Sequence, residues 1–125
     1  MSILYKKHGL YPDSILIRKF VGKVSVDDII ESWEYLQKNK LIDDKIKGLI
    51  NDLTGCELLL DMNCFSTLMI YMKSQDFIRA IKIAVICDTP QKIVFPVMGE
   101  KHHSELKIKP FSTLEAAVHW INLDY

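Results

Sequence analysis

Residues that could bind or react gather directly after one apolar segment of the chain. The segment is residues 46–53, which we predict to be a strand, and the polar residues are Asp52, Thr54, Gly55 and Asp61. Open α/β sheets place ligands at the carboxyl ends of their strands, so these residues could form a loop that contacts a ligand or a regulatory partner. Alternatively, Asp52 and Asp61 cap a turn and a helix, and Gly55 supplies a positive φ. Both interpretations stay open at this point.

Thr89 stands at the corresponding point after the next apolar segment, residues 81–87. If both segments are parallel strands, their carboxyl ends lie at one edge of the sheet, and Thr89 joins the same candidate site. Alternatively, Thr89 or Asp88 caps a helix that begins at Pro90. An acidic cap at Asp61 argues against phosphate binding there, because its carboxylate already occupies the helix N-terminus.

Other residue types that serve in catalysis or metal binding are scattered. His102 and His103 are adjacent, and neighbours in an extended chain point to opposite sides, so they do not share one metal. The chain has no Cys-x-x-Cys, no His-x-x-x-His and no glycine-rich phosphate loop. Cys56 and Cys64 stand in no catalytic signature, and we expect Cys64 and Cys87 to be small core residues. We therefore predict no catalytic residues, no metal and no cofactor.

Composition excludes several classes of protein. The chain has 125 residues, of which 49% are hydrophobic and 26% charged, so we expect one globular domain over residues 1–125. Its 16 basic and 16 acidic residues give zero net charge, which argues against nucleic-acid binding. Three cysteines without a signal-peptide pattern predict reduced thiols and a cytoplasmic protein. No apolar run approaches the ~20 residues needed to span a membrane.

The order of the predicted elements indicates an α/β fold. We expect strands over residues 3–7, 15–21, 46–53, 81–87 and 106–109, and helices that begin after Ser25 and Asp61, at residue 90, and after Ser112. Gly22 is expected to end the second strand, and residues 56–60 to form a link. The almost continuously apolar run 81–87 is typical of a central parallel strand. Alternation with helices predicts a mostly parallel sheet of about five strands with about four helices, in the order β-β-α-β-α-β-α-β-α. The first strand is expected at an antiparallel edge.

Particular residues predict where these elements begin and end. Ser25 is expected to cap the first helix in a shortened capping box, and Ser112 with Glu115 forms the full capping box of the last helix. Pro110 is expected to end the last strand, because proline has no N–H for strand pairing. Pro96 falls inside the third helix, where a proline removes a hydrogen bond, so the conformation there is left open.

Four marks along nearly the whole chain carry a family resemblance. They are the entry from Gly22 through Ser25 into the first helix, the strand that ends in Asp52, the strand 82–85, and the ending 111–120. That ending combines a phenylalanine, a cap, an acid, two alanines and a tryptophan. Together with the element order, these marks resemble the SpoIIAA-like branch of the STAS fold, in its small bacterial members.

The resemblance implies a function that depends on protein contacts. Anti-sigma-factor antagonists of the STAS type carry a phosphorylated serine or threonine between the third strand and the second helix, typically in Asp-Ser-Ser-Gly. The matching region, residues 52–62, offers Thr54 beside Gly55 but no Ser-Ser-Gly, which departs from the phospho-switch pattern. The resemblance therefore implies a non-enzymatic cytoplasmic module that contacts a protein partner through the loops 52–61 and 88–90 together with the second helix. Two-fold homodimerisation is a further prediction, since such dimers are the commonest oligomers.

Two other functions are weighed by particular residues of the sequence. A small apolar, lipid-like ligand could lie against the second helix, whose Met62, Phe65, Met69, Tyr71 and Met72 could line a cavity or a dimer surface, or simply belong to the core. Relatives of the fold that bind nucleotides or lipids keep ligand binding open. An enzyme would need an acid of shifted pKa beside a thiol or hydroxyl, and nothing in the sequence assembles such a set.

Overall fold

A five-stranded sheet in the order β1-β2-β3-β4-β5 organises the computed structural model, which describes residues 1–124. The strands are β1 (Ser2–Lys7), β2 (Ile15–Ser25), β3 (Gly48–Leu59), β4 (Lys82–Ile86) and β5 (Lys107–Phe111). The helices are α1 (Val26–Lys38), α2 (Met62–Lys73), α3 (Asp76–Arg79), α4 (Pro90–His102) and α5 (Leu114–Ile121). β1 is antiparallel to β2 and the remaining neighbours are parallel, so the predicted fold class and edge strand are confirmed.

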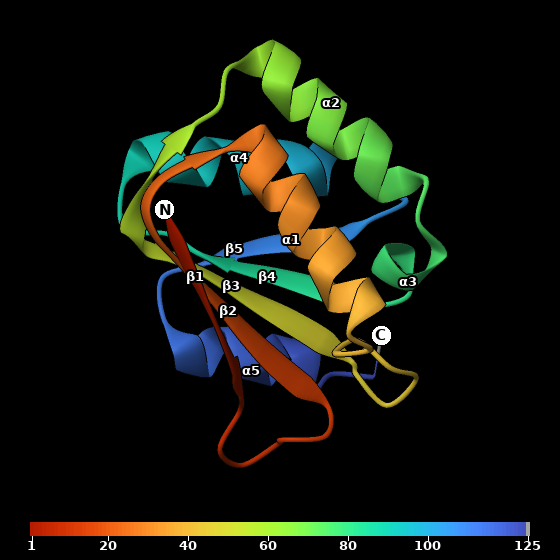
Figure 1. The fold of residues 1–125 in the computed structure, drawn as a ribbon. Helices are drawn as coiled ribbons and strands as arrows, with labels where there is room; N and C mark the ends of the chain where they lie inside the picture. The colour runs from red at the N-terminus through yellow and green to blue at the C-terminus, as the bar shows by residue number, and fades with distance from the viewer. Residues whose placement is uncertain (125) are drawn as a thin grey trace.

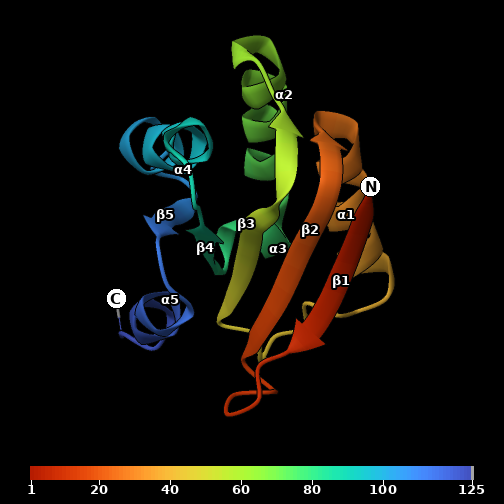
Figure 2. The same cartoon turned by 90° about the vertical axis from the view of Figure 1, so that its left-hand side faces the viewer.

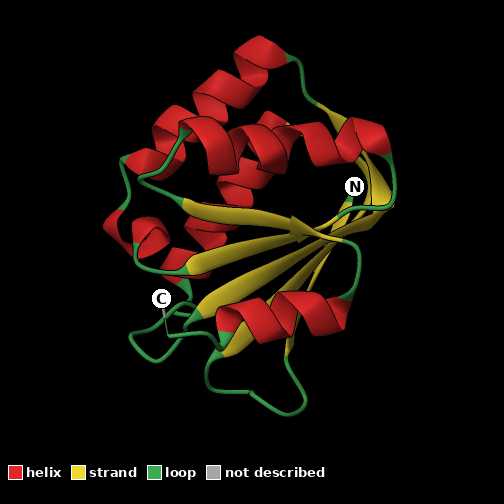
Figure 3. Ribbon diagram, turned by 180° about the vertical axis from the view of Figure 1, so that it is seen from behind, coloured by secondary structure: helices red, strands yellow, loops and turns green. Residues whose placement is uncertain are grey.

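Helices cover the two faces of the sheet unequally. α5 lies alone on one face, and α1, α2, α3 and α4 lie on the other (Figure 1 and Figure 3). The smaller core under α5 is built around Ile50, Ala84 and Ile121, and the larger core on the opposite face contains Trp33 and Phe65. Every residue of β4 is buried, as predicted, because both faces of this strand are covered.

β2 and β3 extend well past the rest of the sheet. Their register shifts at a β-bulge, where Leu53 and Thr54 together lie opposite Phe20. Pairing then resumes and continues as far as Ser25 and Leu59. Figure 2 shows this two-stranded ribbon rising beyond β4 towards α1 and α2.

The extension corrects the predicted strand ends. Gly22 does not end β2, because it pairs with Cys56 inside the ribbon, where it has a φ of 89°. Residues 56–60 are mostly strand rather than a link. Gly55 pairs with Val21 and has no positive φ. Asp52, Thr54 and Gly55 therefore lie within β3 and not in a loop, which differs from the predicted position of the candidate site.

Side-chain caps start the helices largely where expected. Ser25 and Asp28 form the predicted capping box at 2.9 and 3.2 Å. The Asp61 carboxylate accepts a hydrogen bond from the Cys64 amide at 2.8 Å, and Thr89 caps α4. These contacts satisfy amide groups that have no partner within the helix.

The last helix begins one residue later than predicted. Thr113, and not Ser112, is its cap, and the Thr113 hydroxyl accepts a hydrogen bond from the Ala116 amide at 3.2 Å. Glu115 consequently lies in the first turn, where an acid favours the helix dipole, instead of closing a capping box.

Two prolines are accommodated inside regular elements. α4 continues through Pro96 to His102, because Pro96 is buried and Phe95 and Met98 pack on the large core on either side of it. Pro110 lies within β5 opposite Val85, a position that an edge strand tolerates.

The short helix α3 was not predicted, so the described chain has five helices where about four were expected. No helix within residues 1–124 is long and apolar enough to cross a membrane.

Gly48→Ala tests the contact that seats α5 on the sheet. An added Cβ would lie 2.7 Å from three side-chain atoms of Ile121, which is 2% exposed. We expect the free energy of unfolding to fall by about 1–3 kcal/mol, as for other overpacked cores, in urea titrations. Gly9→Ala is the matched control, because nothing lies within 4 Å of its Cβ. Equal stability of the two variants would contradict this packing.

Candidate functional site

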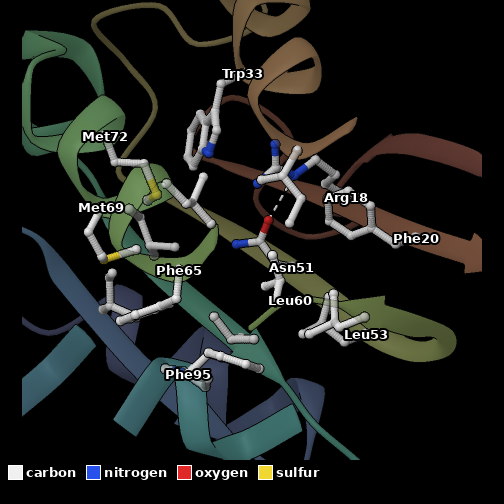
Figure 4. A pocket seen from close by; sticks show the side chains of 17 residues that line it. Arg18, Phe20, Trp33, Asn51, Leu53, Leu60, Phe65, Met69, Met72 and Phe95 are labelled. Atoms are coloured by element: carbon white, nitrogen blue, oxygen red, sulfur yellow. Dashed lines mark hydrogen bonds between the residues drawn. The ribbon is translucent and has the colours of Figure 1, made fainter. Parts of the chain in front are cut away.

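An apolar cavity of about 90 Å³ lies between the sheet and helices α1, α2 and α4. Its wall is formed by 17 side chains from these helices, from strands β2 to β5 and from the link before α2 (Figure 4). All of them are apolar except Arg18 and Asn51. A concave apolar pocket with a few convergent polar groups is the usual form of a small-molecule site.

Arg18 and Asn51 are held by a chain of buried hydrogen bonds. They lie directly opposite each other on β2 and β3, and Arg18 Nε donates to Asn51 Oδ1 at 2.8 Å. Asn51 Nδ2 in turn donates to the Ala84 carbonyl of β4 at 3.1 Å. Arg18 Nη1 donates to Ser32 Oγ on α1 at 3.0 Å, and Ser32 bonds the Tyr5 hydroxyl of β1 at 2.8 Å. The guanidinium is thereby fixed in orientation.

The Arg18 charge is buried without an acidic partner. Arg18 is 2% exposed, and its guanidinium lies 4.4 Å from the ring centre of Trp33 and 4.9 Å from that of Phe20. Among the five ion pairs of residues 1–124, none includes Arg18. Burial lowers the pKa of Arg18 to about 9, which still leaves it charged at neutral pH. Trp33 Nε1, in the same wall, is buried with no hydrogen-bond partner.

Partly exposed lining residues indicate where the cavity meets the surface. Only Leu58, Leu60 and Phe95 of its lining residues are partly exposed, whereas the others are buried. Its mouth therefore lies between the end of β3, the link to α2, and α4. Of the second-helix residues that could have lined a cavity, Phe65, Met69 and Met72 do so, whereas Tyr71 and the 52% exposed Met62 lie outside the lining.

Three of the residues predicted from the sequence gather on the surface at the bulge of β3. Asp52 Oδ1 accepts hydrogen bonds from the Thr54 amide at 2.9 Å and from its hydroxyl at 2.7 Å. Lys19 Nζ lies 3.8 Å from Asp52 Oδ2, a largely solvated ion pair. An added Cβ on Gly55 would lie 3.4 Å from Lys19 Cε. The Thr54 hydroxyl is exposed but already bonded to its own neighbour.

Asp61 and Thr89 each cap a separate helix. The Cys64 amide lowers the pKa of the Asp61 carboxyl by donating to it. No hydrogen bond or ion pair among the described residues joins Asp61 or Thr89 to Asp52. Lys92 Nζ, at 2.7 Å from Asp88 and 2.8 Å from the Leu53 carbonyl, instead ties α4 to β3. None of these five polar residues, Asp52, Thr54, Gly55, Asp61 and Thr89, lines the cavity.

Arg18 and Asn51 were missed, although a signal was present in the sequence. Side chains alternate along a strand, so Arg18 shares a face with Leu16 and Phe20, and Asn51 shares one with Leu49. A polar residue at the centre of an apolar face is the informative exception to burial rules.

The thiols and imidazoles form no catalytic or metal set in the described part of the chain. Cys87 is buried as predicted, and burial raises its pKa to about 11. Burial also raises the pKa of Cys56. Cys64 is partly exposed, contrary to the predicted core position, because it lies in the first turn of α2. His103 packs edge-on against Phe65, and no cluster of three potential metal ligands occurs within residues 1–124.

Alkylation by iodoacetamide at about pH 8 tests this distribution of thiols. At that pH roughly one Cys87 thiol in a thousand is ionised, and the thiolate is the reactive form. We expect mass spectrometry of the native protein to show Cys64 modified first, and Cys56 and Cys87 to react only after denaturation. Loss of the first adduct in Cys64→Ala is the control. Faster modification of Cys87 than of Cys64 would contradict this distribution, because it would show that the Cys87 thiol is reactive despite its burial.

Comparison with known proteins settles the fold. No protein-family model matches the chain, and no curated protein matches it. A solved structure described as an uncharacterized protein of the DUF3478 family with a SpoIIAA-like fold, from Shewanella loihica PV-4, superposes with a TM-score of 0.62. The chain has a SpoIIAA-like fold. The superposition covers 96% of this chain and 92% of the Shewanella protein at 19% identity, a level at which the likeness concerns the fold alone. The family resemblance read from the sequence is confirmed in this respect.

Proposed function

We propose that this chain is a non-enzymatic STAS-like binding module, one domain over residues 1–125, which holds a small apolar ligand. The observation that carries the proposal is the cavity beneath α2 and α4, with its apolar wall and its mouth at Leu58, Leu60 and Phe95. Apolar cavities that are not filled by the protein bind apolar molecules, because such molecules leave water and gain contacts. Each buried methylene group of a ligand contributes about 0.8 kcal/mol. Met69 and Met72 give the wall side chains that adapt to different shapes.

A variant that obstructs the mouth tests this function. Leu60 lines the cavity, whereas its neighbour Leu59 is 48% exposed and does not. We expect Leu60→Trp to weaken binding of benzene, a neutral apolar molecule of the size of the cavity, by about fivefold in calorimetry, because the indole would occupy the entrance. Leu59→Trp adds the same group beside the mouth and is expected to leave benzene binding unchanged.

The protein must be stripped of bound compounds before these titrations. Solvent extraction of the purified protein provides the companion measurement, in which we expect one apolar compound in stoichiometric amount. Failure of stripped protein to bind benzene, or equal affinities of the two tryptophan variants, would refute the proposal.

The second candidate is a regulatory module that contacts a protein partner in the cytoplasm. The observation in its favour is that exposed apolar side chains adjoin the mouth in sequence: Leu59 and Met62 beside Leu60, and Ile93 and Val94 before Phe95. Exposed apolar groups that lie together are a common feature of interaction surfaces. In this proposal Asp52, Thr54, Gly55, Asp61 and Thr89 lie at the rim of the contact, and Thr54 is the candidate for modification.

Pull-downs from the native host with Thr54→Glu combined with Asp61→Arg test the second candidate. We expect the double variant to lose any specifically retained partner, because it reverses or adds charge at the rim. Asp61→Arg also removes a helix cap, so Thr113→Arg, which removes the cap of α5 on the opposite face, is the matched control. Unchanged retention by the double variant would exclude this surface. Sizing of the same samples tests the predicted homodimer.

A further inference from the structure

Arg18 presents unused hydrogen-bond donors in the wall of the cavity. A guanidinium has five N–H groups, and Arg18 uses one from Nε and one from Nη1. Its Nη2 group makes no hydrogen bond to any of residues 1–124. Trp33 Nε1, another donor in the wall, is buried and unpartnered. Figure 4 shows Arg18 on one side of the cavity and Phe65 and Met69 on the other.

The partners that Arg18 has are neutral. Asn51 and Ser32 orient the guanidinium but cannot neutralise it, and the rings of Trp33 and Phe20 offset only part of the lost hydration. Buried charges in proteins are normally paired, and a buried cation with no anion is unfavourable. An anion that enters the cavity would therefore gain more from Arg18 than it would from an exposed arginine.

The charge and shape of the cavity select among anions. Arg18 is its single cationic residue, and the remaining wall is apolar apart from Asn51. A phosphate group carries up to two charges and several oxygens, which one guanidinium in an apolar wall does not satisfy. A carboxylate carries one charge, and its two oxygens match the planar fork of an arginine.

We propose that the cavity binds a small amphipathic carboxylate, such as a short-chain fatty acid, with the carboxylate on Arg18 and the hydrocarbon chain along the α2 and α4 wall. This inference rests on the proposed ligand-binding function and names the chemical class of the ligand. Asn51 and Ser32 act as positioning residues, since they hold the guanidinium in the orientation that the carboxylate meets.

A series of head groups on one chain length tests the proposal in the wild-type protein. Butanoate, 1-butanol and butylammonium, which match a cavity of about 90 Å³ in size, are titrated into stripped protein by calorimetry at about pH 7.5. We expect butanoate to bind about tenfold more tightly than butanol, from a charge-assisted hydrogen bond, and butylammonium to bind least well. Equal affinities for butanoate and butanol would overturn the carboxylate assignment while leaving the apolar site in place. Absence of binding by all three would overturn both proposals.

Variants then locate the preference. Arg18→Met is expected to reduce butanoate affinity to that of butanol, while butanol binding, which also reports that the cavity is folded, stays within about threefold of the wild type. Lys19→Met is the matched control, because it removes a positive charge from the adjacent position of β2, whose side chain points to the other face. Loss of the preference in Lys19→Met, or its survival in Arg18→Met, would overturn the proposal. If Arg18→Met does not fold, the head-group series in the wild type decides.

Discussion

The parallel pairing of β2 with β3 is the interaction on which the candidate site depends. Its register places Arg18 directly opposite Asn51, so the one cation of the cavity wall meets an amide that orients it. The bulge opposite Phe20 then lets both strands continue beyond β4. This extension carries the β3 end to the mouth of the cavity, where Leu58 lies.

A polar network inside the large core joins five elements of the fold. Hydrogen bonds run from Tyr5 on β1 through Ser32 on α1 and Arg18 on β2 to Asn51 on β3, and on to a carbonyl of β4. Such networks specify one arrangement strongly, because a member left without partners in a low dielectric is costly. The network therefore explains how a charged residue is tolerated there, and why its side chain has a defined direction towards the cavity.

The polar residues at the ends of β3 and β4 and the residues that line the cavity perform different tasks. Asp61 and Thr89 use their side-chain oxygens to cap helices, and Asp52 bonds its neighbour Thr54 at the bulge. These local bonds agree with the capping interpretation of the same residues. The cavity instead depends on side chains far apart in sequence, which meet because the strands lie in parallel and the helices cover one face of the sheet.

Local patterns in the sequence determined the fold class, the antiparallel first strand, and the caps at Ser25 and Asp61, because periodicity and capping involve residues near one another in the chain. The length of the β2–β3 ribbon and the helix through Pro96 were decided by tertiary packing, which outweighs the local preferences of glycine and proline. The place of Arg18 on an apolar face was readable from the alternation of its strand. Only the tertiary structure decided that no acidic side chain pairs with Arg18, since ion pairing depends on which distant side chains the fold brings within reach.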